Sequence, residues 1–123
     1  MKLDAAARRK AVRAGRWAEN LCAWHLRARG YRILVRRLRT TVGEIDILAR
    51  RGRVLAVIEV KARPSIAQAA ESIGATQRKR VRRAAEAFLA QNPSLAGLDL
   101  RFDAMLAAPW RLPVHVRDAW RPE

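Results

Sequence analysis

The chain has 123 residues, with 26 Lys and Arg against 11 Asp and Glu and a formal net charge of +15. This length predicts a single domain, 1–123, with a substantial core. The sequence has no apolar run near the roughly 20 residues of a membrane helix, and its N-terminal segment lacks the apolar region of a secretory signal. The single cysteine, Cys22, excludes an intramolecular disulfide framework. We therefore expect a cytoplasmic protein.

The excess of basic residues predicts a polyanionic partner, because unbalanced like charges destabilise a compact fold. Nucleic acid, most simply DNA, is the partner that this charge favours. An anionic membrane is the weaker alternative, since the basic clusters RRKAVRAGR, RRLR and RKRVRR do not form one amphipathic face. Solvated surface arginines, reflecting a biased composition, remain the plain alternative to a functional surface.

Hydrophobic periodicity predicts a helix over about 6–29, with a basic segment, 1–14, that we expect to fray. Gly30 is a typical helix stop. The segment YRILVRR then alternates as a strand with one wet face, and EIDILA follows Gly43 as a second strand. The segment RVLAVIEV is apolar without alternation, as in a strand covered on both faces. The short connection RRGR predicts that the second and third strands form a hairpin.

After Pro64 comes an alanine-rich stretch that ends near Gly74, and Thr76 is a candidate N-cap for the next helix. That helix has apolar residues at i, i+3, i+4, i+7 and i+8, the pattern of a helix packed on a sheet: Val81, Ala84, Ala85, Phe88 and Leu89. LRFDAMLA and VHVRDAW are the last predicted strands. The element order predicts a mixed β-sheet flanked by helices.

The few acidic residues are placed informatively. Asp46 lies on the second predicted strand and Glu59 at the end of the third, so a hairpin puts them side by side on one face. Two close carboxylates repel each other, and a divalent cation such as Mg²⁺ removes that repulsion. Spacing alone leaves open an ordinary salt bridge between Glu59 and Lys61. Glu44 shares the face of Asp46. It either supports the metal-binding carboxylates or has a structural role.

The segment GEIDILARRGRVLAVIEVKAR resembles the signature of the PD-(D/E)XK nuclease superfamily, and specifically that of the YraN-type family of small endonuclease-like bacterial proteins. That family is similar to archaeal Holliday-junction resolvases. GRWAENLCAWHLRARGYRIL, QRKRVRRAAEAFL, RFDAML and VHVRDAW resemble further segments of the family, so the resemblance extends from Gly15 to Trp120. It implies an α/β, restriction-endonuclease-like αβββαβ core.

The resemblance also implies the roles of individual residues. Asp46 and Glu59 would bind Mg²⁺ or Mn²⁺, and Glu19 on the first helix would complete the acidic shell. Lys61 would orient or activate the attacking water. Gln77, at the start of the second amphipathic helix, would point at the same site. For Glu19 the alternative is a surface pair with Arg16, one turn earlier.

The implied activity is that of a metal-dependent DNA endonuclease acting on branched or recombining DNA. The alternatives are a catalytically silent nucleic-acid-binding accessory protein on the same fold and a structural protein whose basic surface meets an acidic protein. A homodimer is consistent with the analogy to the resolvases. Three features depart from the usual family pattern, namely Arg37, Gln77 and the segment SIAQAAESIG. These departures bear on the choice of substrate more than on the fold.

Other candidate residues have structural interpretations. Asp103 is expected to pair with a nearby arginine, and Cys22, on the core stripe, is not expected to be a catalytic thiol. His115 has no partner at metal-binding spacing. Trp17 and Trp24 share one helix face and are interpreted as core or dimer contacts in preference to platforms for unpaired bases.

Overall fold

The computed structural model describes residues 5–121. The helices are α1 (Ala5–Ala28), α2 (Ile66–Glu71), α3 (Ala75–Gln91) and the 3₁₀ helix η1 (Pro93–Leu95), and the strands are β1 (Arg32–Arg39), β2 (Glu44–Arg51), β3 (Val54–Ala62), β4 (Asp99–Ala107) and β5 (Val114–Val116). The predicted α/β class with a mixed sheet is confirmed, with α2 as an added short helix. Of the basic segment 1–14, residues 1–4 lie outside the described residues and 5–14 belong to α1.

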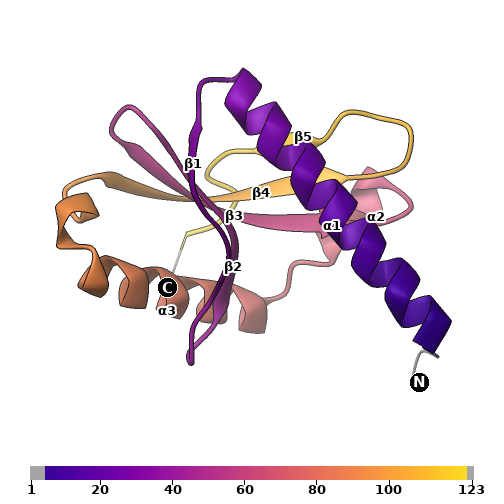
Figure 1. The fold of residues 1–123 in the computed structure, drawn as a ribbon, viewed down its shortest axis with the longest axis horizontal. Helices are drawn as coiled ribbons and strands as arrows, with labels where there is room; N and C mark the ends of the chain where they lie inside the picture. The colour runs from indigo at the N-terminus through magenta and orange to yellow at the C-terminus, as the bar shows by residue number, and fades with distance from the viewer. Residues whose placement is uncertain (1–4, 122–123) are drawn as a thin grey trace.

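The five strands form one sheet in the order β1-β2-β3-β4-β5 (Figure 1). Strands β1, β2 and β3 are antiparallel neighbours, as the short connections predict. Strand β4 pairs in parallel with β3, because α2 and α3 carry the chain back before β4 begins. Strand β3 therefore lies at the centre of the sheet, which explains why its sequence is apolar on both faces.

The two faces of the sheet are covered by different helices. On one face α1 packs Cys22 and Leu26 against Ile47, Ile58 and Met105. On the other face α3 packs against the sheet in a separate cluster, whose members include Leu48, Val57, Val81, Ala84 and Phe102. Figure 1 shows α1 passing across β3 and β4. Residues 55–58 of β3 thus alternate between the two clusters, whereas Ile45 and Ile47, on either side of Asp46 in β2, belong to different clusters.

Some local predictions are wrong in detail. Helix α3 begins at Ala75 with Gly74 as its N-cap, so Thr76 is not the cap. The side chains of Trp17 and Trp24 are 55% and 68% exposed, so neither belongs to the core.

Cys22 is fully buried, as the core stripe predicts. Its burial raises the pKa of the thiol to about 12, with smaller contributions from Glu19 and Asp46, so Cys22 is not a thiolate nucleophile.

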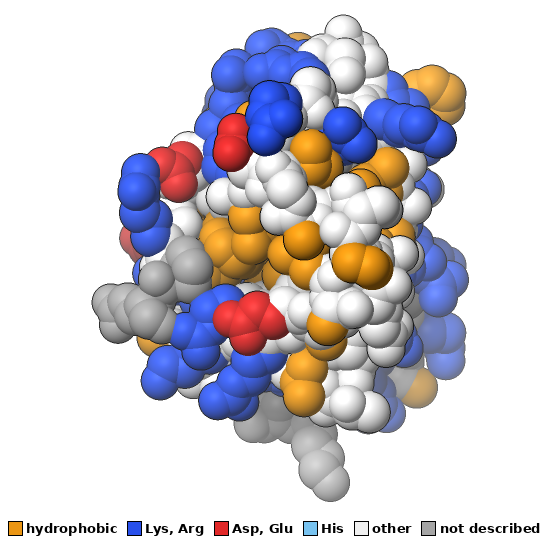
Figure 2. All heavy atoms as spheres, turned by 90° about the vertical axis from the view of Figure 1, so that its left-hand side faces the viewer, with side chains coloured by type: hydrophobic (Ala, Val, Ile, Leu, Met, Phe, Trp, Pro, Cys, Tyr) orange, Lys and Arg blue, Asp and Glu red, His pale blue; other side chains and the backbone are white. Residues whose placement is uncertain are grey.

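Basic side chains dominate the surface. Figure 2 shows Lys and Arg gathered along the edges of one face, with hydrophobic side chains between them and few acidic groups. Arg32 and Arg50 lie directly opposite each other on β1 and β2, where like charges destabilise a strand pair. An anionic partner would relieve this repulsion. Among residues 5–121, no helix is long and apolar enough to cross a membrane.

Candidate functional site

The hairpin of β2 and β3 brings Asp46 and Glu59 together. The antiparallel pairing of the two strands ends at Ile47 and Ile58, and Asp46 and Glu59 are the next residues beyond that pair. The Oδ2 atom of Asp46 accepts a hydrogen bond from the backbone N–H of Val60 at 2.8 Å. The first carboxylate is therefore anchored to the strand that carries the second.

Two further side chains hold the Glu59 carboxylate. The Lys61 Nζ atom lies 3.3 Å from Glu59 Oε1, and both side chains are largely buried. From α3, the side-chain amide of Gln77 donates a hydrogen bond to the same Oε1 atom. The structure thus brings together four of the five residues that the sequence assigned to the site, namely Asp46, Glu59, Lys61 and Gln77.

The electrostatics of this group are unfavourable to two negative charges. Burial, followed by the charge of Asp46, raises the pKa of Glu59 to about 7, and Lys61 opposes this rise. Burial also raises the pKa of Asp46, although the Val60 N–H lowers it. A hydrogen bond between the two carboxyl groups contributes to the raised pKa of Glu59. Without a bound cation, the pair is therefore arranged to share a proton near neutral pH.

Substituting Glu59 by Gln is expected to stabilise the metal-free protein at alkaline pH. The folded-state pKa of Glu59 lies above its unfolded value, so the wild type loses stability as pH rises from about 4.5 to 7, by up to about 3 kcal/mol. Gln cannot ionise and retains an acceptor for Gln77. Urea unfolding in EDTA at pH 5 and pH 8 measures the difference. Glu86→Gln, at an exposed position on α3, should leave the pH dependence unchanged, and destabilisation by Glu59→Gln at pH 8 would contradict the expectation.

Glu19 forms ion pairs with arginines of β1. Its side chain is buried on α1, and its carboxylate contacts Arg36 Nη2 at 3.0 Å and Arg37 Nε at 3.1 Å. The expected alternative partner, Arg16, is not the one that binds it. Both carboxylate oxygens accept hydrogen bonds from guanidinium groups. Glu19 therefore belongs to an ion-pair network with two arginines of β1, and it also lines the pocket that contains Asp46.

The backbone of β1 makes this double contact possible. Consecutive residues of a strand normally point to opposite faces, yet Arg36 and Arg37 both reach Glu19. Arg37 has a φ of 53°, in the left-handed region that a residue with a side chain seldom adopts. This conformation interrupts the alternation at Arg37. The alternating pattern of the sequence gives no signal for it, which is why the arginine pair was not predicted.

Two pockets meet at Asp46. The α1 pocket, of about 250 Å³, lies between α1 and the ends of the first three strands, and its lining residues are Gly15, Arg16, Glu19, Arg37, Arg39, Glu44, Asp46, Val60 and Ala62. The α3 pocket, of about 490 Å³, is lined by Glu44, Asp46, Glu59, Ser72, Gly74, Thr76, Gln77, Arg80 and Val81. Asp46 and Glu44 line both pockets. Asp46 is thus open to ligands from both pockets, and Glu59 is open to them from the α3 pocket. The charged side chains of the α1 pocket are three arginines and three carboxylates.

Gly43 allows α3 to approach the site. A Cβ atom at Gly43 would lie 2.0 Å from the backbone oxygen of Arg80, three residues after Gln77. Only a residue without a side chain permits this contact. The close approach holds the first turns of α3 beside β2 and places Gln77 within reach of Glu59.

Gly43→Ala is therefore expected to lower the free energy of unfolding by about 1–3 kcal/mol, because the helix backbone has to move away from the strand. Thermal unfolding measures the change. Gly97→Ala is the matched control, since a Cβ at Gly97 meets no atom within 4 Å. Equal stability of the two variants would mean that α3 can move away from Gly43 without lowering the free energy of unfolding. The contact would then not be what positions Gln77.

The donor set fits a hard divalent cation with few protein ligands. Within residues 5–121, no group of three or more His, Cys, Asp or Glu side chains is arranged to hold a metal ion. Asp46 and Glu59 nevertheless supply two adjacent carboxylates whose mutual repulsion a cation would remove. Mg²⁺ commonly binds through one or two carboxylates, with waters and substrate phosphate completing its shell. The carboxylate pair therefore fits Mg²⁺ or Mn²⁺.

Asp103 has the structural role that its sequence position suggested. It is completely buried and accepts hydrogen bonds from Arg101 Nε and Nη2, each at 2.8 Å. The His115 Nε2 atom lies 2.8 Å from the Oδ2 atom of Asp103, which accounts for a histidine without a metal-ligand partner. These groups form a network away from the residues that line the two pockets.

The fold and the site together define an α/β protein with a restriction-endonuclease-like core, a mixed sheet whose hairpin presents a carboxylate pair and a lysine. A family model described as "Uncharacterised protein family UPF0102" matches residues 18–107. The chain belongs to this family, which is the YraN family that the motifs indicated.

Relatives with about half of their residues identical span most of the chain. A UPF0102 protein of Paramagnetospirillum magneticum is 50% identical over 94% of this chain and 92% of its own length. One of Maricaulis maris is 53% identical over 94% of this chain and 91% of its own length. Another, of Parvibaculum lavamentivorans, is 52% identical over 91% of this chain and 84% of its own length.

Proposed function

We propose that the protein is a metal-dependent DNA endonuclease that hydrolyses phosphodiester bonds. The observation that carries the proposal is the adjacent carboxylate pair of the half-buried Asp46 and the buried Glu59, with Lys61 at 3.3 Å from Glu59. Two adjacent carboxylates held partly out of water destabilise a fold when both are ionised, and a structural ion pair does not require the second of them. Such unfavourable groups cluster at functional sites. Branched or recombining DNA is the substrate class suggested by the resemblance to resolvases.

Asp46 and Glu59 would hold Mg²⁺ or Mn²⁺. The bound ion would supply Lewis-acid stabilisation of the phosphate and a lowered pKa for a nearby water. Gln77 fixes the direction of the Glu59 carboxylate through its hydrogen bond to Oε1, and the Val60 N–H does the same for Asp46. Both carboxylates are thus held in place from neighbouring elements before any ligand arrives, as preorganised sites require.

Lys61 would act on the reacting groups. Its ammonium group contacts the Glu59 carboxylate, so it lies at the edge of the proposed ion site. From there it would orient the attacking water through a hydrogen bond and stabilise the negative charge that develops on the phosphate oxygens.

The α1 pocket supplies the electrostatic surface for a DNA backbone. Arg16, Arg37 and Arg39 line it together with Glu19, Glu44 and Asp46, so a phosphate held by the arginines would lie beside Asp46. Glu19 neutralises part of the charge of Arg37 and fixes its guanidinium group. The formal charge of +15 over the whole chain adds long-range attraction for a polyanion.

The proposal is tested by incubating the protein with a four-way junction, a flap, a linear duplex and a single strand in Mg²⁺ or Mn²⁺. Asp46→Asn is the matched variant, because asparagine keeps an oxygen acceptor for the Val60 N–H and removes the charge. We expect cleavage by the wild type that falls at least about 100-fold in the variant, a loss at the upper end of that seen for supporting groups of metal sites.

Cleavage that persists in Asp46→Asn would contradict the proposal, because it would come from another site or a contaminant. No cleavage by either protein, together with tight salt-sensitive DNA binding by both, would favour the alternative of a silent binding protein. The observation that favours this second candidate is the engagement of Glu19 by Arg36 and Arg37, which leaves two carboxylates where the resemblance implies three.

A further inference from the structure

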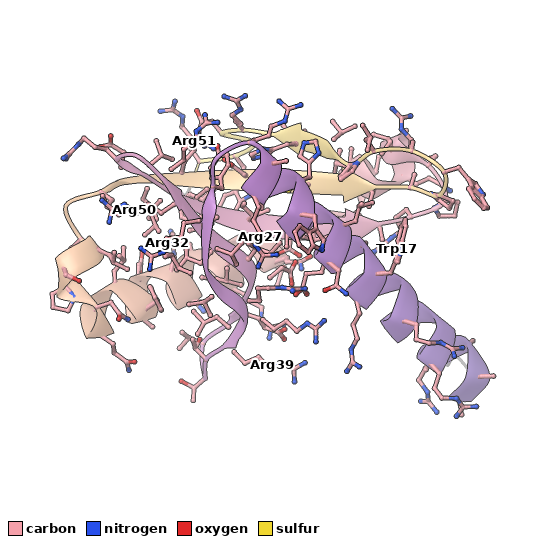
Figure 3. The ribbon with its side chains drawn as sticks, turned by 45° about the horizontal axis from the view of Figure 1, so that its top comes forward. Trp17, Arg27, Arg32, Arg39, Arg50 and Arg51 are labelled. Carbon is pink, nitrogen blue, oxygen red and sulfur yellow. The ribbon has the colours of Figure 1, made fainter. Side chains whose placement is uncertain are left out.

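An apolar groove with two exposed indoles lies beside the carboxylate site. It has a volume of about 570 Å³, and Trp17 and Trp110 line it together with Pro64, Ala107 and Pro109. The side chain of Trp17 is 55% exposed and that of Trp110 is 100% exposed. Figure 3 shows Trp17 projecting from α1 beside the ends of β3 and β4. We refer to this surface as the tryptophan groove.

The backbone holds Trp110 out of the core at a cost. Trp110 has a φ of 63°, a left-handed conformation that is unfavourable for a bulky side chain by about 1–3 kcal/mol. Such strain persists where the surrounding structure imposes it, and it is common at ligand sites. Full exposure of the indole also forgoes the hydrophobic stabilisation that burial would provide. Both costs are offset if a ligand covers the indole.

The tryptophan groove adjoins the α1 pocket at Ala62. Ala62, the last residue of β3, lines both of them, and it directly follows Lys61. Arg16, next to Trp17 in the chain, lines the α1 pocket, and Arg63 lines the groove. A strand whose phosphate lies in the α1 pocket therefore has its neighbouring nucleotides against an apolar surface with aromatic walls and a guanidinium group.

The charge of the chain decides between the occupants of such a surface. A second copy of this chain would bring another +15 charges against the first, and that repulsion opposes self-association through a face that carries Arg63. A nucleic-acid strand has the complementary charge. Indole faces beside arginines are the surface on which unpaired bases stack, with no need for sequence-specific contacts. Bases in a continuous duplex are already stacked and do not have free faces to offer.

We propose that the tryptophan groove binds unpaired bases of the DNA strand whose phosphate occupies the Asp46–Glu59 site. The proposal rests on the proposed function for the position of the phosphate, and it specifies the substrate class as DNA with single-stranded or unpaired nucleotides. Trp17 and Trp110 act in binding and specificity and do not touch the reacting atoms.

Binding in EDTA tests this proposal separately from catalysis. Fluorescence anisotropy of a labelled 12-nucleotide thymidine strand, and of a duplex of mixed sequence, is measured for the wild type, Trp17→Ala and Trp110→Ala. Trp24→Ala is the matched control, because Trp24 is an exposed indole on α1 that does not line the groove. Trp17→Phe tests rescue by a smaller aromatic face, and melting curves confirm that each variant is folded.

We expect each groove variant to lose roughly 5- to 150-fold in affinity for the single strand, with duplex affinity and the Trp24→Ala variant unchanged. Equal single-strand affinity in all variants would overturn the proposal. A dimer that dissociates in the groove variants while their single-strand affinity is unchanged would overturn it too, by assigning the groove to self-association. Loss of single-strand binding without DNA cleavage by the wild type would support the groove and reject only the nuclease.

Discussion

Replacing Asp103 by asparagine is expected to lower the free energy of unfolding at pH 7 by about 3–5 kcal/mol. The buried carboxylate accepts hydrogen bonds from the guanidinium group of Arg101 and from the backbone N–H of Asp118, and it lies beside His115. Arg101 also donates to the Tyr31 hydroxyl. The carboxylate thus joins β4, β5 and the C-terminal turn. An amide in its place directs an NH₂ group at donors and leaves the charge of Arg101 without its partner.

The pH dependence has a definite sign. Burial alone would raise the pKa of Asp103, but the hydrogen bonds from His115, Arg101 and Asp118 outweigh it and lower the pKa below its ordinary value. The stabilisation is therefore present above the unfolded-state pKa of about 3.9 and is lost as pH falls through the lower, folded-state value. Urea unfolding of the wild type and the variant is measured at pH 7 and at acid pH. The two free energies of unfolding should become more similar as the pH falls.

Asp99→Asn is the control for the Asp103 variant, because Asp99 begins the same strand with an exposed side chain. We expect it to change the free energy of unfolding by less than about 0.5 kcal/mol. If Asp103→Asn were as mild as this control, the buried network would not stabilise the fold in the way that its geometry implies.

Lys61→Met is expected to lower the rate of DNA cleavage by about 10²- to 10⁴-fold while leaving Mn²⁺ affinity at least as high as in the wild type. Methionine has a similar length and no charge. Because the ammonium group lies 3.3 Å from Glu59, its removal takes a positive charge away from the proposed ion site and does not weaken cation binding there. A lower cleavage rate without a lower Mn²⁺ affinity would show that Lys61 acts in the reaction and does not help to bind the ion.

Cleavage at saturating Mn²⁺ and calorimetric titration of Mn²⁺ on the same preparations measure both quantities. Lys61→Arg keeps the charge and serves as the control for electrostatics alone. A parallel loss of rate and metal affinity in Lys61→Met would show that Lys61 supports the site itself, and an unchanged rate would exclude it from the reaction.

The sequence predicted the part of the site that depends on strand periodicity. Alternation in EIDILA, the apolar run before Glu59 and a short connection are enough to pair β2 with β3, and the pairing places Asp46 beside Glu59. The helical stripe that includes Val81 likewise directs Gln77 toward the sheet. These inferences rest on periods of 2 and 3.6 residues, which local sequence encodes directly.

Other features depend on backbone conformations and contacts that periodicity does not encode. The left-handed φ of Arg37 gives Glu19 two arginine partners from β1, whereas helix spacing pointed to Arg16. Spacing of seven residues puts Trp17 and Trp24 on one side of α1 but does not say how far that side lies from the core. The Trp110 conformation, and with it the tryptophan groove, arises from tertiary structure around the end of β4.

The carboxylate pair illustrates a conflict between stability and function. A raised pKa for both Asp46 and Glu59 means that the folded protein keeps together two groups that repel when ionised. Natural proteins retain such unfavourable groups where activity requires them. The same pair explains why the stability of the metal-free protein and its proposed activity should respond in opposite directions to Glu59→Gln.

The most direct test of the central claim is a calorimetric titration of Mn²⁺ into the wild type and Asp46→Asn at pH 7.5, without DNA. We expect one bound ion per wild-type chain and an Mn²⁺ affinity at least about 100-fold weaker in the variant, with both proteins equally folded by circular dichroism. Equal Mn²⁺ affinity in the two proteins, or no binding to the wild type, would contradict the claim that Asp46 and Glu59 form a metal site.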